Sequence, residues 1–212
     1  MPAGDFERMP PERRRRLVRT AAAEFAAAGY AHASLNRIIR ECRLSKSSFY
    51  HVISSKTELF DLVVRDLVAS VLEDVRIPAP EEFSNADFWS HVDRLMDTLA
   101  DASARNEAFA ALGGIFYLSD TAGQMPDAVS EALATIGTWL QQVLLTGRSR
   151  GAVRDDLPFE LQSRLVFAVL RTLDQWVAGR ASTMPVAESA CYIRAAAGTI
   201  RRMLDPALDT PA

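Results

Sequence analysis

Residues 34–56, SLNRIIRECRLSKSSFYHVISSK, have the pattern of two short helices joined by a tight turn. In the first half, apolar residues recur at the i, i+3, i+4 and i+7 spacing of a single helical face, and such a face has to be buried. These residues are Leu35, Ile38, Ile39 and Cys42. The first half therefore predicts a short helix packed on a neighbouring element.

The second half predicts a helix with a narrow apolar anchor. Ser45 supplies a hydroxyl that can accept from the free N–H groups of a helix start. The anchor consists of Phe49, Val52 and Ile53, and the other face is made of hydrogen-bonding groups, from Lys46, Ser47, Ser48, Tyr50 and His51. A short helix with a polar, cationic outer face fits the major groove of DNA. The pattern is typical of the recognition helix of a helix-turn-helix.

From Leu17 to Leu67 the chain resembles the N-terminal domain of the TetR (tetracycline repressor) family of bacterial transcriptional regulators. The resemblance is carried by an apolar helix ending AAAEFAAAGY, the hydroxyl of Ser34, Ile38, the turn RLSKSSFYHVISSK, and Lys56 followed by Leu59. The chain departs from the family at Arg43, usually glycine, at Ser54, usually proline, and at Val52 and Ile53, which replace a common His-Phe pair. The family's glycine lies in the turn, where a non-glycine residue such as Arg43 with positive φ costs on the order of 1 kcal/mol.

The resemblance implies a DNA-binding set, although each member also has a purely structural interpretation. Residues at the positions of Ser34, Tyr50 and Lys56 contact phosphates in the family, and those at Ser45 to Ser48 reach bases. Ser45 could be only a cap and Tyr50 only packing, and His51 either contacts phosphate or covers Tyr50. Lys46 is the best candidate for a base contact, because a lysine can donate to guanine O6 and N7. The predicted set is Ser34, Ser45, Lys46, Ser47, Ser48, Tyr50, His51 and Lys56.

The distribution of charge supports this interpretation. The 212 residues carry a net charge of −3, but residues 1–56 hold 11 Lys and Arg against 5 Asp and Glu, a net +6, which leaves −9 for the remainder. Such an asymmetry suggests that the N-terminal part meets a polyanion. A run such as Arg13 to Arg16 is more often a solvated helix face. Beside a recognition helix, and at a helix N-terminus where cations are disfavoured, it indicates contact with phosphate.

Helical patterns extend over the rest of the chain. Residues 1–10 are expected to form a flexible arm; Pro11 begins an apolar-striped helix that ends at Gly29. Ser55 to Glu58 form an S-x-x-E capping box that opens a helix reaching toward Pro78. Further helices are expected near 86–99, 107–118, 126–147, 158–177 and 185–204, and the pair Gly113-Gly114 predicts a kink or a close backbone approach.

The predicted fold is therefore all-α. Residues 1–55 are expected to form a three-helix helix-turn-helix domain, joined through a linking helix to a larger helical ligand-binding and dimerisation domain, residues 56–212. The 49% hydrophobic content supports a real core.

The C-terminal helices carry two predicted sites, and the first is a pocket for a small apolar or amphipathic ligand. An aromatic residue at helical spacing is more often core than ligand site, but several aromatics around a Gly-Gly pair favour a cavity. The predicted lining is Phe88, Trp89, His91, Met96, Phe109, Phe116, Tyr117, Trp139, Gln142 and Trp176.

The second site is a homodimer interface made by the last two helices. Small residues along the last helix allow close helix approach, and two recognition helices must lie about 34 Å apart to enter successive major grooves. The predicted interface is Leu165, Val169, Leu173, Ala187, Cys191, Ala195 and Ile200.

Other classes of function find little support in the sequence. The three histidines have no zinc-ligand spacing, and no Gly-rich phosphate loop or catalytic triad can be assembled, so neither an enzyme nor a metal or cofactor site is expected. No apolar run reaches the roughly 20 residues of a membrane span, which favours a cytoplasmic protein. Cys42 and Cys191 are expected to be reduced core thiols.

The sequence thus predicts a homodimeric transcriptional regulator that binds an operator in double-stranded DNA. It is expected to be a repressor released by a small-molecule ligand. The alternative is a helical ligand-binding or protein-interaction module without sequence-specific DNA binding.

Overall fold

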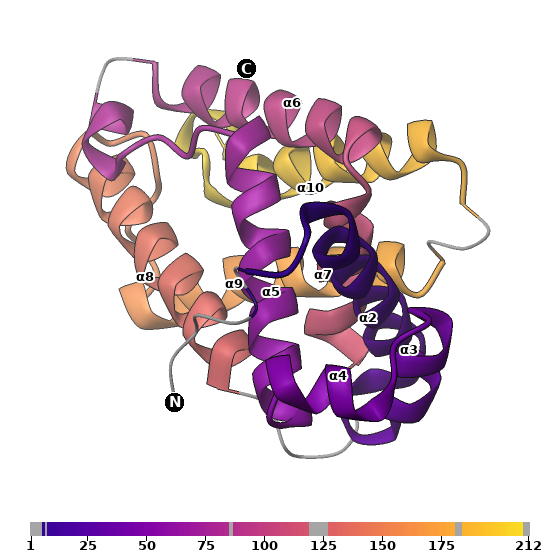
Figure 1. The fold of residues 1–212 in the computed structure, drawn as a ribbon. Helices are drawn as coiled ribbons and strands as arrows, with labels where there is room; N and C mark the ends of the chain where they lie inside the picture. Colours follow the sequence, from indigo (N-terminus) through magenta and orange to yellow (C-terminus); the bar gives the residue numbers. More distant parts are fainter. Residues whose placement is uncertain (1–5, 7, 85–86, 119–126, 181–183, 210–212) are drawn as a thin grey trace. The chain divides into compact units, whose positions relative to one another are not determined.

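The protein is described by a computed structural model that covers residues 6, 8–84, 87–118, 127–180 and 184–209 (Figure 1). Within these ranges the regular elements are α-helices and two short 3-10 helices, so the all-α prediction is confirmed. None of the described helices combines the length and the apolar character that crossing a membrane requires.

The chain forms two compact units, one from Met1–Ser70 with Ala108–Ser130 and one from Val71–Glu107 with Glu131–Ala212. This division does not coincide with the predicted boundary between residues 55 and 56. Helix α7 (Glu107–Leu118) lies mainly in the first unit, although it comes late in the chain. A Cβ on Gly114 would lie 2.9 Å from the Cβ of Ala26, so the close approach expected for the glycine pair is observed at Gly114.

Helix α2 (Pro11–His32) is the brace of the first unit. Proline occupies one of its first positions, where a missing N–H costs nothing. Its apolar stripe is buried as predicted, through Leu17, Val18, Ala21, Ala22 and Phe25. Gly29 has φ 70°, which breaks the helix there, and one more helical turn follows to His32. The positive φ at Gly29 explains why glycine is needed at this position.

The N-terminal segment differs from the expected flexible arm at Phe6. The Phe6 side chain is only 9% exposed, and the backbone carbonyl of Phe6 accepts from the N–H of Met9 at 3.2 Å. The sequence did not reveal this anchor because a single aromatic between charged residues has no periodicity. Residues 1–5 and 7 lie outside the described ranges.

Helix α5 (Lys56–Asp74) begins with a modified capping box. The N–H of Glu58 donates to Ser55 Oγ at 3.0 Å, as predicted, but the carboxylate of Glu58 accepts from the N–H of Ser54 at 2.7 Å rather than from Ser55. Hydrogen bonds from Ser54 hold the pKa of Glu58 below its usual range. Proline, the usual residue in the family, has no N–H to donate, so Ser54 adds a bond that proline lacks.

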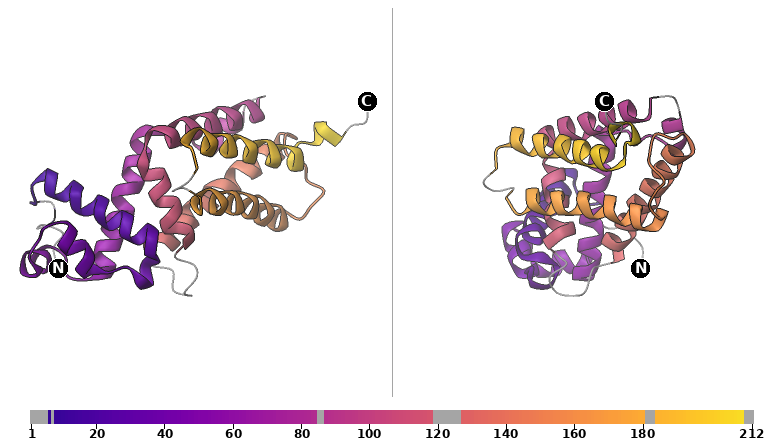
Figure 2. Two further views of the ribbon diagram at one scale, coloured as in Figure 1. Left: turned by 90° about the vertical axis from the view of Figure 1, so that its right-hand side faces the viewer. Right: turned by 180° about the vertical axis from the view of Figure 1, so that it is seen from behind.

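The second unit is built from α6 (Phe88–Arg105), most of α8 (Asp127–Ser149), α9 (Phe159–Ala178) and α10 (Val186–Leu204), with the 3-10 helix η1 (Pro80–Ser84). Helix α10 packs against α6 and α9, and it runs beside α6 in Figures 1 and 2. Arg194 reaches Asp97 at 2.7 Å and Asp101 at 3.1 Å, which ties α10 to α6 by charge as well as by packing.

The two cysteines differ in their surroundings. Cys42 is buried, and burial raises the pKa of its thiol, as expected for a core residue. Cys191 is exposed on α10, so the prediction of a core thiol is wrong there. The small residues of α10 repeat around the helix, and the sequence pattern could not distinguish its inner face from its outer one.

Candidate nucleic-acid interface

Helix α3 (Leu35–Glu41) is fixed at its start by two different groups. Ser34 caps the helix, since its hydroxyl accepts from the N–H of Arg37 at 3.3 Å. The buried carboxylate of Glu24 on α2 accepts from the N–H of Ser34 at 2.8 Å and from Nη1 of Arg37 at 3.1 Å. Ile38 and Ile39 are buried as predicted, whereas Leu35 is half-buried. Glu24 thereby sets the position of α3 relative to α2.

A tight turn at Cys42–Ser45 leads into the next helix. Arg43 has φ 55°, and among the described residues it is the one non-glycine residue with positive φ. The turn is closed by the N–H of Leu44, which donates to the carbonyl of Ile39 at 3.1 Å. The family's usual glycine at this position is explained by the positive φ, and the chain has arginine there despite the steric cost.

Helix α4 (Lys46–Val52) has the two faces expected of a recognition helix. Ser45 caps it by accepting from the N–H of Ser48 at 3.0 Å. Phe49 and Ile53 are fully buried, and Val52 is half-buried. The opposite face is exposed and includes Tyr50, 51% exposed, together with Lys46, Ser47, Ser48 and His51. Five hydrogen-bonding side chains are therefore presented outward from a rigidly anchored helix.

Two of the predicted phosphate contacts also have partners inside the protein. Lys56 is half-buried at the start of α5 and donates from Nζ to the carbonyl of Ala31 at 3.0 Å. Its Nζ lies 5.1 Å from the centroid of the Tyr30 ring, and burial lowers its pKa. Ser34 uses its hydroxyl as the cap of α3. Phosphate contact by Ser34 and Lys56 stays a prediction.

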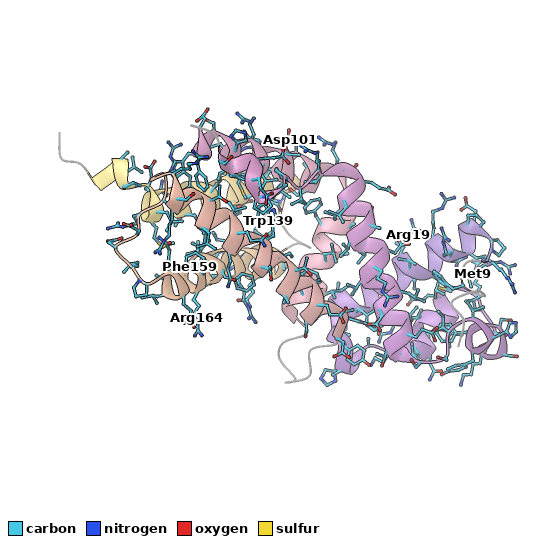
Figure 3. The ribbon with its side chains drawn as sticks, turned by 90° about the vertical axis from the view of Figure 1, so that its left-hand side faces the viewer. Met9, Arg19, Asp101, Trp139, Phe159 and Arg164 are labelled. Carbon is cyan, nitrogen blue, oxygen red and sulfur yellow. The ribbon has the colours of Figure 1, made fainter. Side chains whose placement is uncertain are left out.

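Arginine side chains line the surface next to the start of α4. A hollow of about 800 Å³ is lined by five arginines together with Ser45 and Ser48. An adjoining hollow of about 560 Å³ is lined by Arg8, Ser47 and His51, among others. Arg13, Leu44 and Ser48 line both hollows, so they form one continuous surface. We call this surface the arginine track; its cationic members are Arg8, Arg13, Arg15, Arg16, Arg19 and Arg43. Arg19, labelled in Figure 3, is the last arginine of the track on α2, and Met9, also labelled there, lines the smaller hollow just before α2 begins.

The predicted ligand-pocket residues are not brought together in one unit. Phe109 and Phe116 lie in the first unit, and the side chain of Tyr117 falls outside the described residues. In the second unit, Phe88, His91 and Trp139 pack around Phe83, with ring centroids 5.9 to 6.0 Å from it. This cluster is a core arrangement.

The other predicted pocket residues have varied surroundings. Trp89 is buried and donates from Nε1 to the carbonyl of Ala152 at 3.0 Å, and Met96 is half-buried. Gln142 and Trp176 are exposed, Trp176 at 47%, and their place in a pocket stays a prediction. Helical spacing alone did not separate core, cavity and surface.

The predicted dimer residues are mostly on the surface of the second unit. On α9, Leu165 is 38% exposed, and Val169 and Leu173 are half-buried. On α10, Cys191 and Ala195 are exposed, and the side chain of Ala187 is outside the described residues. Ile200 is buried, so it belongs to the protein's own core and has little surface to offer a partner. Participation of Ile200 in the interface stays a prediction.

An all-α chain with an N-capped short helix, presented after a tight turn with an exposed polar face, is a helix-turn-helix protein. Residues 17–63 match the family model described as bacterial regulatory proteins, tetR family. This match confirms, over residues 17–63, the resemblance to the TetR family noted from residues 17–67.

The comparisons with individual proteins agree with this assignment. The chain is 36% identical over 94 residues to the HTH-type transcriptional repressor SCO4008 of Streptomyces coelicolor. The matched segment covers 42% of this chain and 44% of that repressor, so it spans less than half of each protein.

Solved structures resemble the chain over nearly its whole length. A TetR family transcriptional regulator from Chloroflexus aurantiacus has a TM-score of 0.70 at 19% identity, with 94% of this chain and 96% of that one covered. The transcriptional regulator FadR from Bacillus subtilis, in complex with stearoyl-CoA, has a TM-score of 0.61 at 12% identity, with 88% and 98% covered. At these identities the likeness establishes the fold.

Proposed function

We propose that this protein is a homodimeric regulator of transcription that binds an operator in double-stranded DNA, acts as a repressor and is released by a small-molecule ligand. The observation that carries the DNA-binding part is the exposed polar face of α4, held by the Ser45 cap and the buried Phe49. As a division of function, residues 1–55 bind DNA and residues 56–212 bind ligand and dimerise. A regulator of this kind acts in the cytoplasm.

Lys46→Ala is expected to reduce operator affinity by a factor of about 5 to 150, because a well-placed base contact contributes roughly 1–3 kcal/mol of discrimination. Affinity for scrambled DNA is expected to fall much less, so the specificity ratio decreases. The measurement is fluorescence anisotropy with duplexes from the region flanking the protein's own gene, against scrambled competitor of equal composition. Arg65→Ala is the control, since Arg65 is an exposed cation on α5 outside the predicted set.

Equal binding of wild-type protein to flanking and scrambled duplexes would contradict sequence-specific regulation. That outcome would favour a protein-interaction module with general affinity for DNA. A specificity ratio unchanged by Lys46→Ala would instead remove Lys46 from the base-contacting set while leaving the regulator intact.

Leu165→Asp is expected to convert the dimer to a folded monomer and to weaken operator binding at least tenfold. The exposed apolar face of α9, with Leu161, Leu165 and Trp176, supports the interface because monomeric proteins rarely expose contiguous apolar surface. Sedimentation equilibrium gives the mass, and anisotropy gives the affinity. Leu145→Asp is the matched control, because Leu145 is 50% exposed on α8. A dimer that survives Leu165→Asp would place the interface elsewhere.

Ligand release is proposed to act through the spacing of the two recognition helices. A ligand can shift the dimer only by its preference for the non-binding arrangement, and a coupling of roughly 1–3 kcal/mol is ordinary. The likeness in fold to a regulator that carries stearoyl-CoA supports a small apolar or amphipathic ligand. A molecule that saturates the dimer without weakening operator binding contradicts this mechanism.

A further inference from the structure

The arginine track holds cations that folding does not account for. Arg15 pairs with Glu12, and Arg16 donates from Nη2 to the carbonyl of Glu41 at 2.7 Å, where it holds the end of α3. Within the described residues, the side chains of Arg13, Arg19 and Arg43 form no hydrogen bond or ion pair, and all three are exposed. These three guanidinium groups are therefore available to an anion.

Two of these arginines occupy positions that are unfavourable in the protein alone. Arg13 lies in the first turn of α2, where the helix dipole disfavours a cation. Arg43 has φ 55°, where glycine would be free of strain. Both arginines lie on one surface, and each is unfavourable for folding. Their charges therefore indicate an interaction with a partner outside the protein.

The track also leads directly to the recognition helix. Its larger hollow reaches Ser45 and Ser48 at the start of α4, and its smaller hollow follows the same helix to Ser47 and His51. When α4 enters a major groove, one edge of that groove is a phosphodiester strand. Guanidinium groups suit such a strand because their fixed N–H donors match phosphate oxygens.

The geometry points to a second DNA-binding surface, in which Arg13, Arg19 and Arg43 clamp consecutive phosphates of the strand beside α4. This deepens the proposed function and rests on it. The site makes the start of α2 part of the DNA interface. Its contacts carry affinity and register, whereas base selection stays with α4.

The test compares the salt dependence of operator binding for wild-type protein, Arg13→Ala/Arg19→Ala and Arg65→Ala. Each lost phosphate contact is expected to reduce the slope of log K against log salt by about 0.9, so the double variant should lose about 1.8 and roughly tenfold in affinity at low salt. Arg65→Ala removes a cation of the same unit outside the track, and its slope should stay near wild type. The ratio of operator to scrambled affinity should be nearly unchanged in the double variant.

Arg43→Gly separates a DNA contact from a structural role. Glycine relieves the positive φ, so the urea midpoint should stay equal or rise, while operator affinity and salt slope fall. A merely structural arginine would move stability and binding in the same direction. Phosphate-ethylation interference supplies a second readout: the phosphates that Arg13 and Arg19 contact should block wild-type protein when ethylated, and only these should lose their effect on Arg13→Ala/Arg19→Ala.

The outcomes distinguish this inference from the proposed function. Selective wild-type binding combined with equal slopes for the double variant and Arg65→Ala overturns the arginine track alone. An interference pattern shared by wild type and the double variant overturns it as well. If wild-type protein binds operator and scrambled DNA equally, the proposed function is overturned and the inference fails with it.

Discussion

Glu24→Ala is expected to destabilise the DNA-binding unit by about 2–4 kcal/mol. The carboxylate is 8% exposed and accepts from the N–H of Ser34 and from Arg37, and hydrogen bonds to charged groups contribute about 1.5–3 kcal/mol each. Removal leaves the Ser34 N–H without its partner beside the start of α3. Arg37 is 55% exposed, so water can solvate its guanidinium and the full penalty of a buried unpaired charge does not apply.

The same substitution is expected to weaken operator binding, since Glu24 positions α3, which braces α4. Urea unfolding followed by far-UV circular dichroism measures stability, and anisotropy at a temperature where the variant is folded measures binding. Glu24→Gln should cost less, because its amide oxygen can still accept from Ser34. Glu41→Ala is the control: its side chain is exposed, and surface changes are usually within about 0.5 kcal/mol. Equal stability of Glu24→Ala and Glu41→Ala would remove Glu24 from the positioning role.

Local features of the DNA-binding segment could be predicted from the sequence because their causes lie within a few residues. The predicted cap at Ser45 depends on a hydroxyl and an N–H three positions later; Ser34 makes the same local bond, although only a phosphate contact was predicted for it. The buried anchor of α4 follows from spacing, whereas the positive φ at Arg43 was implied by the glycine usual at that position in the family. The resemblance to the TetR family added the orientation of these helices, which spacing does not supply.

Contacts between distant segments could not be predicted in this way. Glu24 stands in a run of alanines, and only the fold brings it to Ser34 and Arg37. The reach of Arg16 to the end of α3 and the packing of Gly114 on Ala26 join residues that no periodicity connects. In the second unit, apolar residues all around α9 and α10 made the inner and outer faces ambiguous, so the exposed Cys191 was expected in the core.

Phe60→Ala is expected to have the largest effect on stability, a loss of about 3–5 kcal/mol. Phe60 on α5 is fully buried, and its ring meets Phe25 and Tyr30 of α2 edge to face, with centroids 4.9 and 5.1 Å apart. Removing the ring leaves a cavity and also ends two aromatic contacts worth about 0.5–1.5 kcal/mol each. Phe60→Leu keeps most of the volume and should cost much less.

The consequence for function follows from what the cluster holds in place. Tyr30 shares a hydrogen bond of 2.8 Å with Thr57 and lies under Lys56, so a loosened Phe60 should free the first turn of α5. All three tryptophans lie in the second unit, so tryptophan fluorescence does not report on the first unit. Unfolding of the first unit is therefore followed by far-UV circular dichroism combined with hydrogen exchange of residues 17–63. We expect faster exchange there in Phe60→Ala, together with weaker operator binding. Wild-type exchange rates in these residues would mean that the aromatic cluster is not what holds α5 against α2.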